Sequence, residues 1–520
     1  MRKWIALLLT TLLCVNLLCP VVNAVAEEDP IVLQLWTSNE EVAGNADSFY
    51  LNKLRKDLNI DFDVRVRGVG AGDYMDWLNL TLMTPGEEPD WIRDQAIGLG
   101  TYQQYVDEGI LLELDEEMIR TYMPNYIKWT EKYEEVFGTN ALNLYKVDGK
   151  IYSIPDAGIE LTKFCYMGYR QDWLTKLGYE KTPETLDEMI SFMRDVTFKD
   201  PDGNGVNDTY GFLGITNNVS WGFSPFFGAY GVYPDLFYAK GDKVVYGNVE
   251  PETRTVLELL RDLYAEGIID PEWITLGFDG VMDKIVTGKD GVTWQNWLSF
   301  YSAGGYTEKM QAIDPAVSWA PSTGPVGPNG DQGIMNFNPL AGVGLMFTVA
   351  LEDQEEKLIK YMQVFDAILG DPSYYIAETW GEEGVTYTYD ENGDQVYMDG
   401  WDSQKLFDYG VGSAYRFPSL ETFGRDPDIH DPIDNNAEIT ALRQELLEMS
   451  KGKYNIMGNF VRPVWNEVAA ELPDFESMAT AIIMGEADIS TFDEYVTEWY
   501  AAGGDRVMEE AQAIYDAYLK

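Results

Sequence analysis

The chain of 520 residues is too long for a single hydrophobic core, so two domains are expected. Its content of 45% hydrophobic and 24% charged residues is that of an ordinary globular protein. The formal net charge of −50 argues against nucleic acid and anionic lipid as partners, and it disfavours a polyanionic ligand unless a local basic patch overrides it.

The first 26 residues have the pattern of an export signal. Arg2 and Lys3 form a positive amino-terminal region, and residues 5–18 form an apolar core. Residues 24–26, Ala-Val-Ala, fit the small-residue pattern before a cleavage point, so the mature chain is expected to begin at Glu27. The alternative is a membrane anchor that stays attached. No later stretch is long and apolar enough to span a bilayer.

Alternating strands and helices predict an α/β lobe at the start of the mature chain. Residues 31–35 predict a buried strand, and residues 60–66 alternate between apolar and polar side chains as a half-buried strand does. Because a helical stretch separates them, the order favours a mainly parallel sheet. Residues 89–92 predict a further strand, and residues 147–155 predict a hairpin that leads into a crossover.

A second lobe is expected to begin after Pro155. Thr185 and Glu188 have the spacing of a capping box, which predicts that a helix begins there. Pro251 predicts the start of another helix, and Gly267 follows its expected end.

Residues 200–208 combine carboxylates and an amide with residues that turn sharply. The spacing matches positions 1, 3, 5 and 9 of an oxygen-rich loop for a hard cation, with glycine at position 6 and a backbone carbonyl at position 7. The expected Ca²⁺ ligands are Asp200, Asp202, Asn204, the Val206 carbonyl and Asp208. Position 12 is Gly211 instead of Glu, and the alternative is a solvated acidic turn.

Several separated motifs carry a family resemblance: residues 169–174 (Tyr-Arg-Gln-Asp-Trp-Leu), residues 182–188, the acidic loop 200–208 and residues 485–515. They closely resemble the family 1 extracellular solute-binding proteins, in the branch that takes up oligosaccharides for ABC importers. The resemblance implies two α/β lobes of the periplasmic-binding-protein type that close by a hinge around the ligand. It also implies permease partners and a structural Ca²⁺ at the acidic loop, although Thr209 stands where the family often has an acidic residue.

The rest of the chain predicts a return to the first lobe and then a helical end. Residues 320–333, rich in Pro and Gly, are interpreted as a crossover, followed by a strand at 343–347 and a helix at 353–369. Thr491 and Glu494 predict a further capped helix. The expected division is 27–156 with 315–376 for the first lobe, and 157–314 with 377–520 for the second.

Aromatic residues near predicted strand ends or crossovers are candidates for ligand contacts. Aromatic rings pack against the C–H faces of sugars, and polar groups take the hydroxyls. Cleft loops emerge where the strands of α/β sheets end. The candidates are Trp36, Asn39, Trp91, Trp221, Trp294, Trp297, Trp380 and Glu383. Each has a packing alternative: Trp36 could be core, Trp91 could fill the gap between sheet and helix, and Trp294 and Trp297 could share one packed face.

Catalytic interpretations are weaker. The one histidine, His430, lies in a polar stretch, and with Cys165 alone it cannot form a common zinc site. The strongest alternative is a secreted, calcium-containing glycoside hydrolase, which needs only two suitably spaced carboxylates. A wall or adhesion module would more typically show repeats. The sequence therefore favours a non-catalytic protein that captures an oligosaccharide.

The cysteines bear on how the protein is held outside the cell. Many members of the resembled family are lipoproteins anchored through a cysteine that follows a small residue. Here Cys14 and Cys19 both follow leucine, so secretion to the periplasm or cell surface without a lipid anchor is expected. After cleavage only Cys165 remains, which predicts a chain without an internal disulfide. We also expect a monomer.

Overall fold

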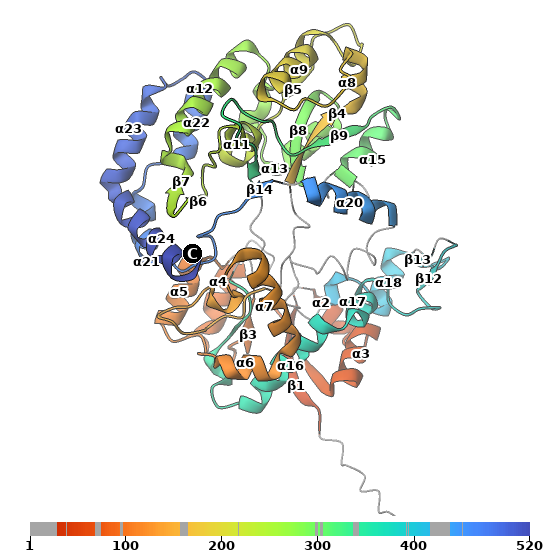
Figure 1. Ribbon diagram of the computed structural model, residues 1–520. Helices are drawn as coiled ribbons and strands as arrows, with labels where there is room; N and C mark the ends of the chain where they lie inside the picture. Colours follow the sequence, from red (N-terminus) through yellow and green to blue (C-terminus); the bar gives the residue numbers. More distant parts are fainter. Residues whose placement is uncertain are drawn as a thin grey trace, which may run out of the picture.

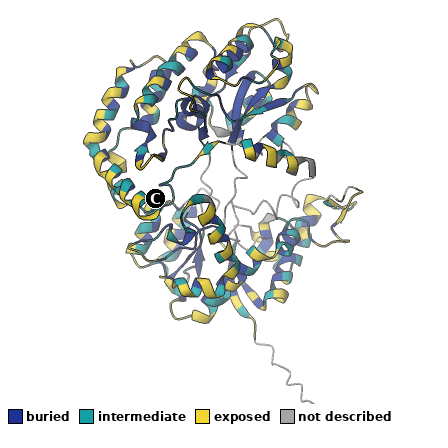
Figure 2. Cartoon of the chain, viewed as in Figure 1, coloured by how far each residue is buried: buried dark blue, intermediate teal, exposed yellow. Residues whose placement is uncertain are grey.

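The computed structural model consists of two bodies, each with its own hydrophobic core (Figure 1). The first lobe contains described residues from 29 to 156 and from 343 to 415, and the second contains those from 165 to 335 and most of those from 437 to 511. Phe460 is an exception, because it packs in the first core. Buried residues line the sheets and the inner helix faces (Figure 2). The structure describes residues 29–37, 39–67, 74–93, 97–156, 165–216, 218–296, 300–301, 305–335, 343–391, 393, 395–415, 437–449 and 451–519.

The first lobe is built on two parallel strands, β1 (Ile31–Thr37) and β2 (Ile60–Val66). A short strand β3 (Trp91–Ile92) pairs antiparallel with β11 (Met346–Phe347), after the chain has returned from the second lobe. An antiparallel hairpin projects from this lobe and consists of β12 (Tyr387–Tyr389) and β13 (Gln395–Tyr397). The helices are α2 (Glu40–Gly44), α3 (Phe49–Leu58), α4 (Tyr74–Leu82), α5 (Leu99–Asp107), α6 (Glu116–Tyr122), α7 (Pro124–Phe137), α16 (Glu355–Gly370), α17 (Pro372–Thr379) and α18 (Ser403–Tyr409).

The second lobe contains a four-stranded mixed sheet in the order β5-β8-β4-β9. Its strands are β4 (Cys165–Arg170), β5 (Tyr210–Phe212), β8 (Asp290–Asn296) and β9 (Trp319–Ser322). Only β5 and β8 are parallel, and β4 is antiparallel to both of its neighbours. A separate hairpin is formed by β6 (Phe237–Lys240) and β7 (Lys243–Tyr246). The helices are α8 (Gln171–Leu177), α9 (Leu186–Phe198), α10 (Val219–Gly222), α11 (Ser224–Ala229), α12 (Pro251–Glu266), α13 (Phe278–Val286) and α15 (Tyr306–Gln311).

The carboxyl-terminal region is helical, as expected, and it links the two lobes. Its elements are α20 (Ala437–Met449), β14 (Gly452–Lys453), α21 (Pro463–Val468), α22 (Phe475–Ile483), α23 (Ser490–Trp499) and α24 (Asp505–Tyr518). Near the end of the chain, Ile514 and Leu519 pack against both hydrophobic cores. Asn466 of α21 donates a 3.1 Å side-chain hydrogen bond to Gln103 of α5. The last helices therefore run along one side of the molecule from the second lobe to the first (Figure 1).

Three of four predicted helix ends are confirmed, and one is wrong. Glu188 donates its backbone N–H to Thr185 Oγ1 at 3.3 Å and accepts the Thr185 N–H, so the capping box is present. Helix α12 begins at Pro251 and ends before Gly267, whose φ is +83°. Helix α23, however, begins at Ser490. The backbone N–H of Ser490 donates to Asp488 Oδ1 at 2.9 Å. Thr491 therefore lies within the first turn and is not the cap.

The predicted division of the chain differs from the observed one at two places. Residues 317–335 belong to the second lobe, because β9 pairs with β4 and β10 (Ile334–Met335) pairs with β14. The Pro- and Gly-rich stretch therefore precedes the return of the chain, which begins after Met335. Conversely, Tyr415 packs in the first core, so that core reaches beyond residue 376.

The prediction of two α/β lobes is confirmed, but the sheet of the second lobe is mixed where a mainly parallel one was expected. The reason is that β4 runs opposite to its neighbours β8 and β9, whereas β5, β8 and β9 share one direction. Among the helices of the described residues, none combines the length and apolar character needed to cross a bilayer. The predicted signal sequence and His430 lie outside the described residues.

Candidate functional site

A hollow of about 200 Å³ opens at the carboxyl ends of the first-lobe strands. The lining residues come from the ends of β1 and β2, from α4 and from the β3 segment. We call it the aromatic hollow, and it is lined by Trp36, Arg67, Tyr74, Trp77, Leu78, Pro89, Trp91 and Arg93. Strand ends of α/β sheets are where such folds place ligands, so this hollow is the best candidate site in the first lobe.

Aromatic rings form a connected wall of the hollow. The Trp36 and Trp77 rings meet edge to face with centroids 5.1 Å apart. Tyr74 lies one helical turn before Trp77 on α4, and their centroids are 5.7 Å apart. Trp36 and Trp77 are only partly buried, whereas Trp91 is 6% exposed and donates its indole N–H to the Gln34 carbonyl at 3.1 Å. The two partly exposed indoles therefore offer the accessible ring surface.

A buried hydrogen-bond network holds the strand ends in place. Gln34 Oε1 accepts from the Trp36 indole at 3.1 Å and from the backbone of Asp90 at 2.9 Å. Tyr361 of α16 accepts from the backbone of Gln34 and donates to Asp90 at 2.7 Å. Lys357 completes the network with a 2.6 Å ion pair to Asp90. The ring of Trp36 is thus tied through β1 to the helix behind the sheet.

Two arginines supply the charge in the hollow. Arg93 forms a 2.9 Å ion pair with Asp156, and both side chains are less than one-tenth exposed. Burial raises the pKa of Asp156, and the Arg93 guanidinium opposes that shift. Asp156 is the last described residue before the chain leaves for the second lobe. The Arg67 guanidinium lies over the Tyr74 ring, 4.9 Å from its centroid.

Of the predicted ligand residues, Trp36 and Trp91 lie together in the aromatic hollow. Trp221 and Trp294 also lie together, but in the core of the second lobe, with ring centroids 4.3 Å apart. Asn39 caps α2 by accepting from the Glu41 backbone at 2.8 Å.

The remaining candidates lie elsewhere. Trp380 packs on Tyr397 of the projecting hairpin, with centroids 4.7 Å apart. Glu383 lies in the exposed turn just before β12. Trp297 lies outside the described residues. All eight predicted ligand contacts therefore stay predictions, although Trp36 and Trp91 do line one hollow.

Six of the eight hollow residues were not predicted from the sequence, among them two arginines and two aromatic residues. Arg67 directly follows β2 and Arg93 directly follows β3, so the strand-end rule that selected Trp36 would also have found them. Tyr74 and Trp77 are three residues apart on α4, a spacing typical of ordinary packing. Only the tertiary structure shows that this helix face turns toward β1.

The acidic loop 200–208 is folded around its own polar groups. Asp200, whose φ is +48°, accepts backbone N–H groups from Gly203, Asn204 and Gly205 at 2.9–3.1 Å. Asn204 Nδ2 donates to Asp202 at 3.0 Å and to Asp208 at 2.9 Å. The predicted ligands therefore do share one compact turn.

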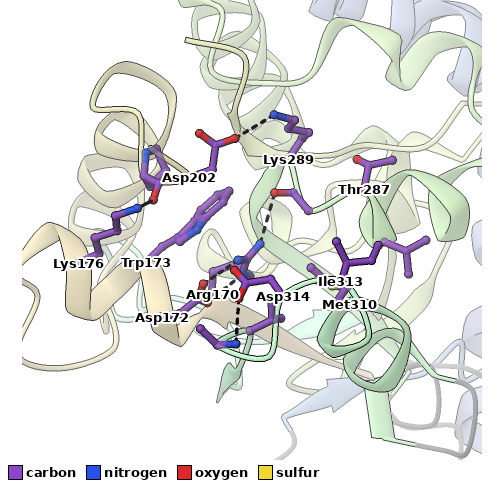
Figure 3. A pocket seen from close by; sticks show the side chains of 15 residues that line it. Arg170, Asp172, Trp173, Lys176, Asp202, Thr287, Lys289, Met310, Ile313 and Asp314 are labelled. Carbon is purple, nitrogen blue, oxygen red and sulfur yellow. Dashed lines mark hydrogen bonds and ion pairs between the residues drawn. The ribbon is translucent and has the colours of Figure 1, made fainter. Parts of the chain in front are cut away.

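A lysine distant in sequence reaches this loop. Lys289 Nζ lies 2.9 Å from Asp202 Oδ2 and 2.8 Å from Asp208 Oδ2, and Figure 3 shows it pointing at the loop. Its hydrogen bond lowers the pKa of Asp208, and the pKa of Lys289 is raised in return. Two carboxylates thus converge on one positive charge. Among the described residues, no group of three or more acidic, His or Cys side chains is arranged as a metal cluster.

Comparison with known families gives one match over more than half of the chain. A family model described as bacterial extracellular solute-binding protein matches residues 44–363. This span contains the acidic loop, the return of the chain to the first lobe and every lining residue of the aromatic hollow except Trp36.

Curated relatives and solved structures are similar over spans of different length. Lipoprotein LipO of Bacillus subtilis is 25% identical over 474 residues, which cover 88% of this chain and 86% of LipO. The fructooligosaccharide ABC transporter substrate-binding protein FusA of Streptococcus pneumoniae is 27% identical over 256 residues, 47% of this chain and 46% of FusA. A structure of a FusA EF-hand mutant in complex with fructo-nystose aligns with a TM-score of 0.66 at 19% identity, covering 94% of this chain and 99% of FusA. The alginate-binding protein AlgQ2 without calcium ion aligns with a TM-score of 0.63 at 19% identity, covering 94% of this chain and 98% of AlgQ2.

Proposed function

Because the chain belongs to the family of bacterial extracellular solute-binding proteins, we propose that its solute is an oligosaccharide held by the aromatic hollow. The chain is a binding protein and not an enzyme, so the glycoside hydrolase alternative has no support. The observation that carries the proposal is the pair of partly exposed indoles, Trp36 and Trp77, beside polar groups at the strand ends. Flat apolar rings suit the C–H faces of a pyranose, and the arginines suit its hydroxyls.

The proposed mechanism is reversible capture. The sugar binds at the strand ends of the first lobe, and the second lobe closes over it, which shields the sugar from water. Closure needs no chemistry on the ligand, and the closed shape is what a permease recognises. FusA is by name an ABC transporter substrate-binding protein, which supports membrane permease subunits as partners. A monomer that is exported through residues 1–26 and released without lipid is part of the same proposal.

Mutation of the aromatic wall tests the site. We expect Trp77→Ala to weaken oligosaccharide binding by about 3- to 10-fold, the value of one lost aromatic contact. Trp401→Ala is the matched control, because this partly buried tryptophan of the first lobe packs on Tyr409 away from the hollow. Isothermal titration of both variants measures the change. Equal affinities of Trp77→Ala and Trp401→Ala for a bound glycan would place the sugar elsewhere.

We further propose that the acidic loop holds a structural Ca²⁺. The donor set of Asp200, Asp202, Asn204, the Val206 carbonyl and Asp208 is made of hard oxygens. The convergence of Asp202 and Asp208 on the Lys289 ammonium supports the fit, because a single charge already sits between them. A bound Ca²⁺ would tie the loop together electrostatically, and Lys289 would have to move aside. Two similar proteins support the proposal, because one structure is of a FusA EF-hand mutant and the other is of AlgQ2 without calcium ion.

Melting in calcium and in chelator tests the metal. Wild-type protein should melt higher in Ca²⁺, and Asp202→Ala should lose this difference. Lys289→Met should enlarge it, because the competing ammonium is gone while all five proposed ligands remain. If wild type and Lys289→Met both melt at the same temperature in Ca²⁺ and in chelator, the loop is only an acidic turn closed by lysine.

A further inference from the structure

The charge of the aromatic hollow is opposite to that of the whole chain. The sequence has 87 acidic and 37 basic residues. Yet the described lining of the hollow contains two arginines and no carboxylate. A site for a neutral sugar is usually furnished with carboxylates and amides that accept from the hydroxyls, and these were available in excess. The composition of the lining therefore points to a ligand that carries negative charge.

Arg67 carries the unbalanced charge. In the described part of the chain its guanidinium has no acidic partner, and its buried Nε has no hydrogen-bond acceptor. Neighbouring arginines differ: Arg55 pairs with Asp61 and Arg65 pairs with Asp63, each at 2.7 Å. Within the described residues, an arginine without an acidic partner is therefore a feature of this position and not of the region.

The structure also fixes where the Arg67 guanidinium lies. The backbone N–H of Arg67 donates to the Thr37 carbonyl at 2.9 Å, which continues the β1–β2 pairing by one residue. Its guanidinium rests on the Tyr74 ring. The other arginine, Arg93, is already balanced by Asp156 at 2.9 Å. Among the described residues, this leaves one guanidinium with no acidic partner at the aromatic wall, and its Nε is buried.

A carboxylate is the group that best matches this guanidinium. The planar fork of arginine binds a carboxylate through two parallel hydrogen bonds, and such charge-assisted bonds are among the strongest in proteins. The net charge of −50 does not oppose this locally, because at physiological salt screening limits its reach to about 8 Å.

We propose that the aromatic hollow binds a uronic acid residue of the oligosaccharide, with its carboxylate on Arg67 and its ring against Trp36 and Trp77. This inference rests on the proposed function, because it names the class of sugar that the same hollow selects. Arg67 is then the specificity-determining residue for acidic over neutral glycans. Arg93, held by Asp156, is left to contact hydroxyls.

Matched glycan pairs test the proposal. The probes are trimers of galacturonic, glucuronic and mannuronic acid, each compared with the same trimer after its carboxyl groups have been reduced to neutral hexose. Wild type should bind at least one acid trimer about 10- to 100-fold tighter than its reduced partner, the value of a hydrogen bond to a charged group. Arg67→Met should abolish that preference, and Arg67→Lys should recover only part of it. Arg55→Met, which removes a paired arginine outside the hollow, should keep it.

The outcomes separate this inference from the proposed function. Binding of neutral trimers as tightly as acid trimers by wild type would overturn the inference and leave oligosaccharide capture intact. An acid preference that survives in a folded Arg67→Met variant would overturn it as well. If no acidic or neutral glycan binds to wild type at all, the proposed function itself fails. Melting curves establish that each variant is folded.

Discussion

The buried ion pair between Arg93 and Asp156 should stabilise the first lobe strongly. Their side chains are 8% and 6% exposed and the pair spans 2.9 Å, so Asp156→Asn leaves a buried guanidinium without its carboxylate. Removal of one partner of such a pair costs about 3–5 kcal/mol. For a lobe of this size the melting midpoint should fall by about 6–20 °C. Differential scanning calorimetry measures the shift and shows whether the lobes unfold separately.

An exposed pair on the same lobe provides the control. Glu116 and Arg120 lie 2.7 Å apart on α6, with side chains 41% and 46% exposed. Glu116→Gln should therefore cost less than about 1 kcal/mol. The double variant Arg93→Met with Asp156→Leu should regain much of the lost stability, because no buried charge remains. If the melting midpoint of Asp156→Asn falls no further than that of Glu116→Gln, burial does not strengthen the Arg93–Asp156 pair.

Three other changes test the packing and electrostatics of the second lobe. Gly211→Ala should destabilise by about 1–3 kcal/mol in urea unfolding, because an added Cβ would lie 2.5 Å from Met193 Cβ; a neutral result would contradict this packing. Thr185→Ala should cost about 1 kcal/mol through loss of the capping box, as urea unfolding would show, and an unchanged midpoint would contradict that role. Burial raises the pKa of Glu476 from 4.5 to about 7. The contribution of this shift to the free energy of unfolding is therefore full below pH 4.5 and is lost as the pH rises through about 7. Glu476→Gln should flatten that part of the stability profile, and an identical profile would argue against a raised pKa.

Local sequence signals predicted several helix ends and the first-lobe strands β1 and β2 well. Thr185, Glu188, Pro251 and Gly267 act within one turn of themselves, so their effects do not depend on the rest of the fold. The same logic failed at Thr491, because Asp488 offered a competing acceptor three residues earlier. Where two caps compete, local pattern alone does not decide the helix start.

The candidate sites were only partly predictable because they join distant segments. Trp36 was found from its place at a strand end, but its partner Trp77 comes from a helix face that only tertiary packing orients. Likewise Lys289 follows the acidic loop by more than 80 residues, and nothing in the loop sequence indicates it. The mixed sheet was missed because the direction of β4 depends on how the chain enters the second lobe.

We expect the protein to bind a glycan and to leave it uncleaved. A thermal-shift screen of residues 27–520 against acidic and neutral oligosaccharides tests this directly. A ligand at 100 times its dissociation constant should add about 2.7 kcal/mol to the stability of the folded state. We predict a raised midpoint with at least one glycan series and recovery of that glycan unchanged after incubation. A screen in which no glycan raises the midpoint, or in which any glycan is cleaved, would contradict the account.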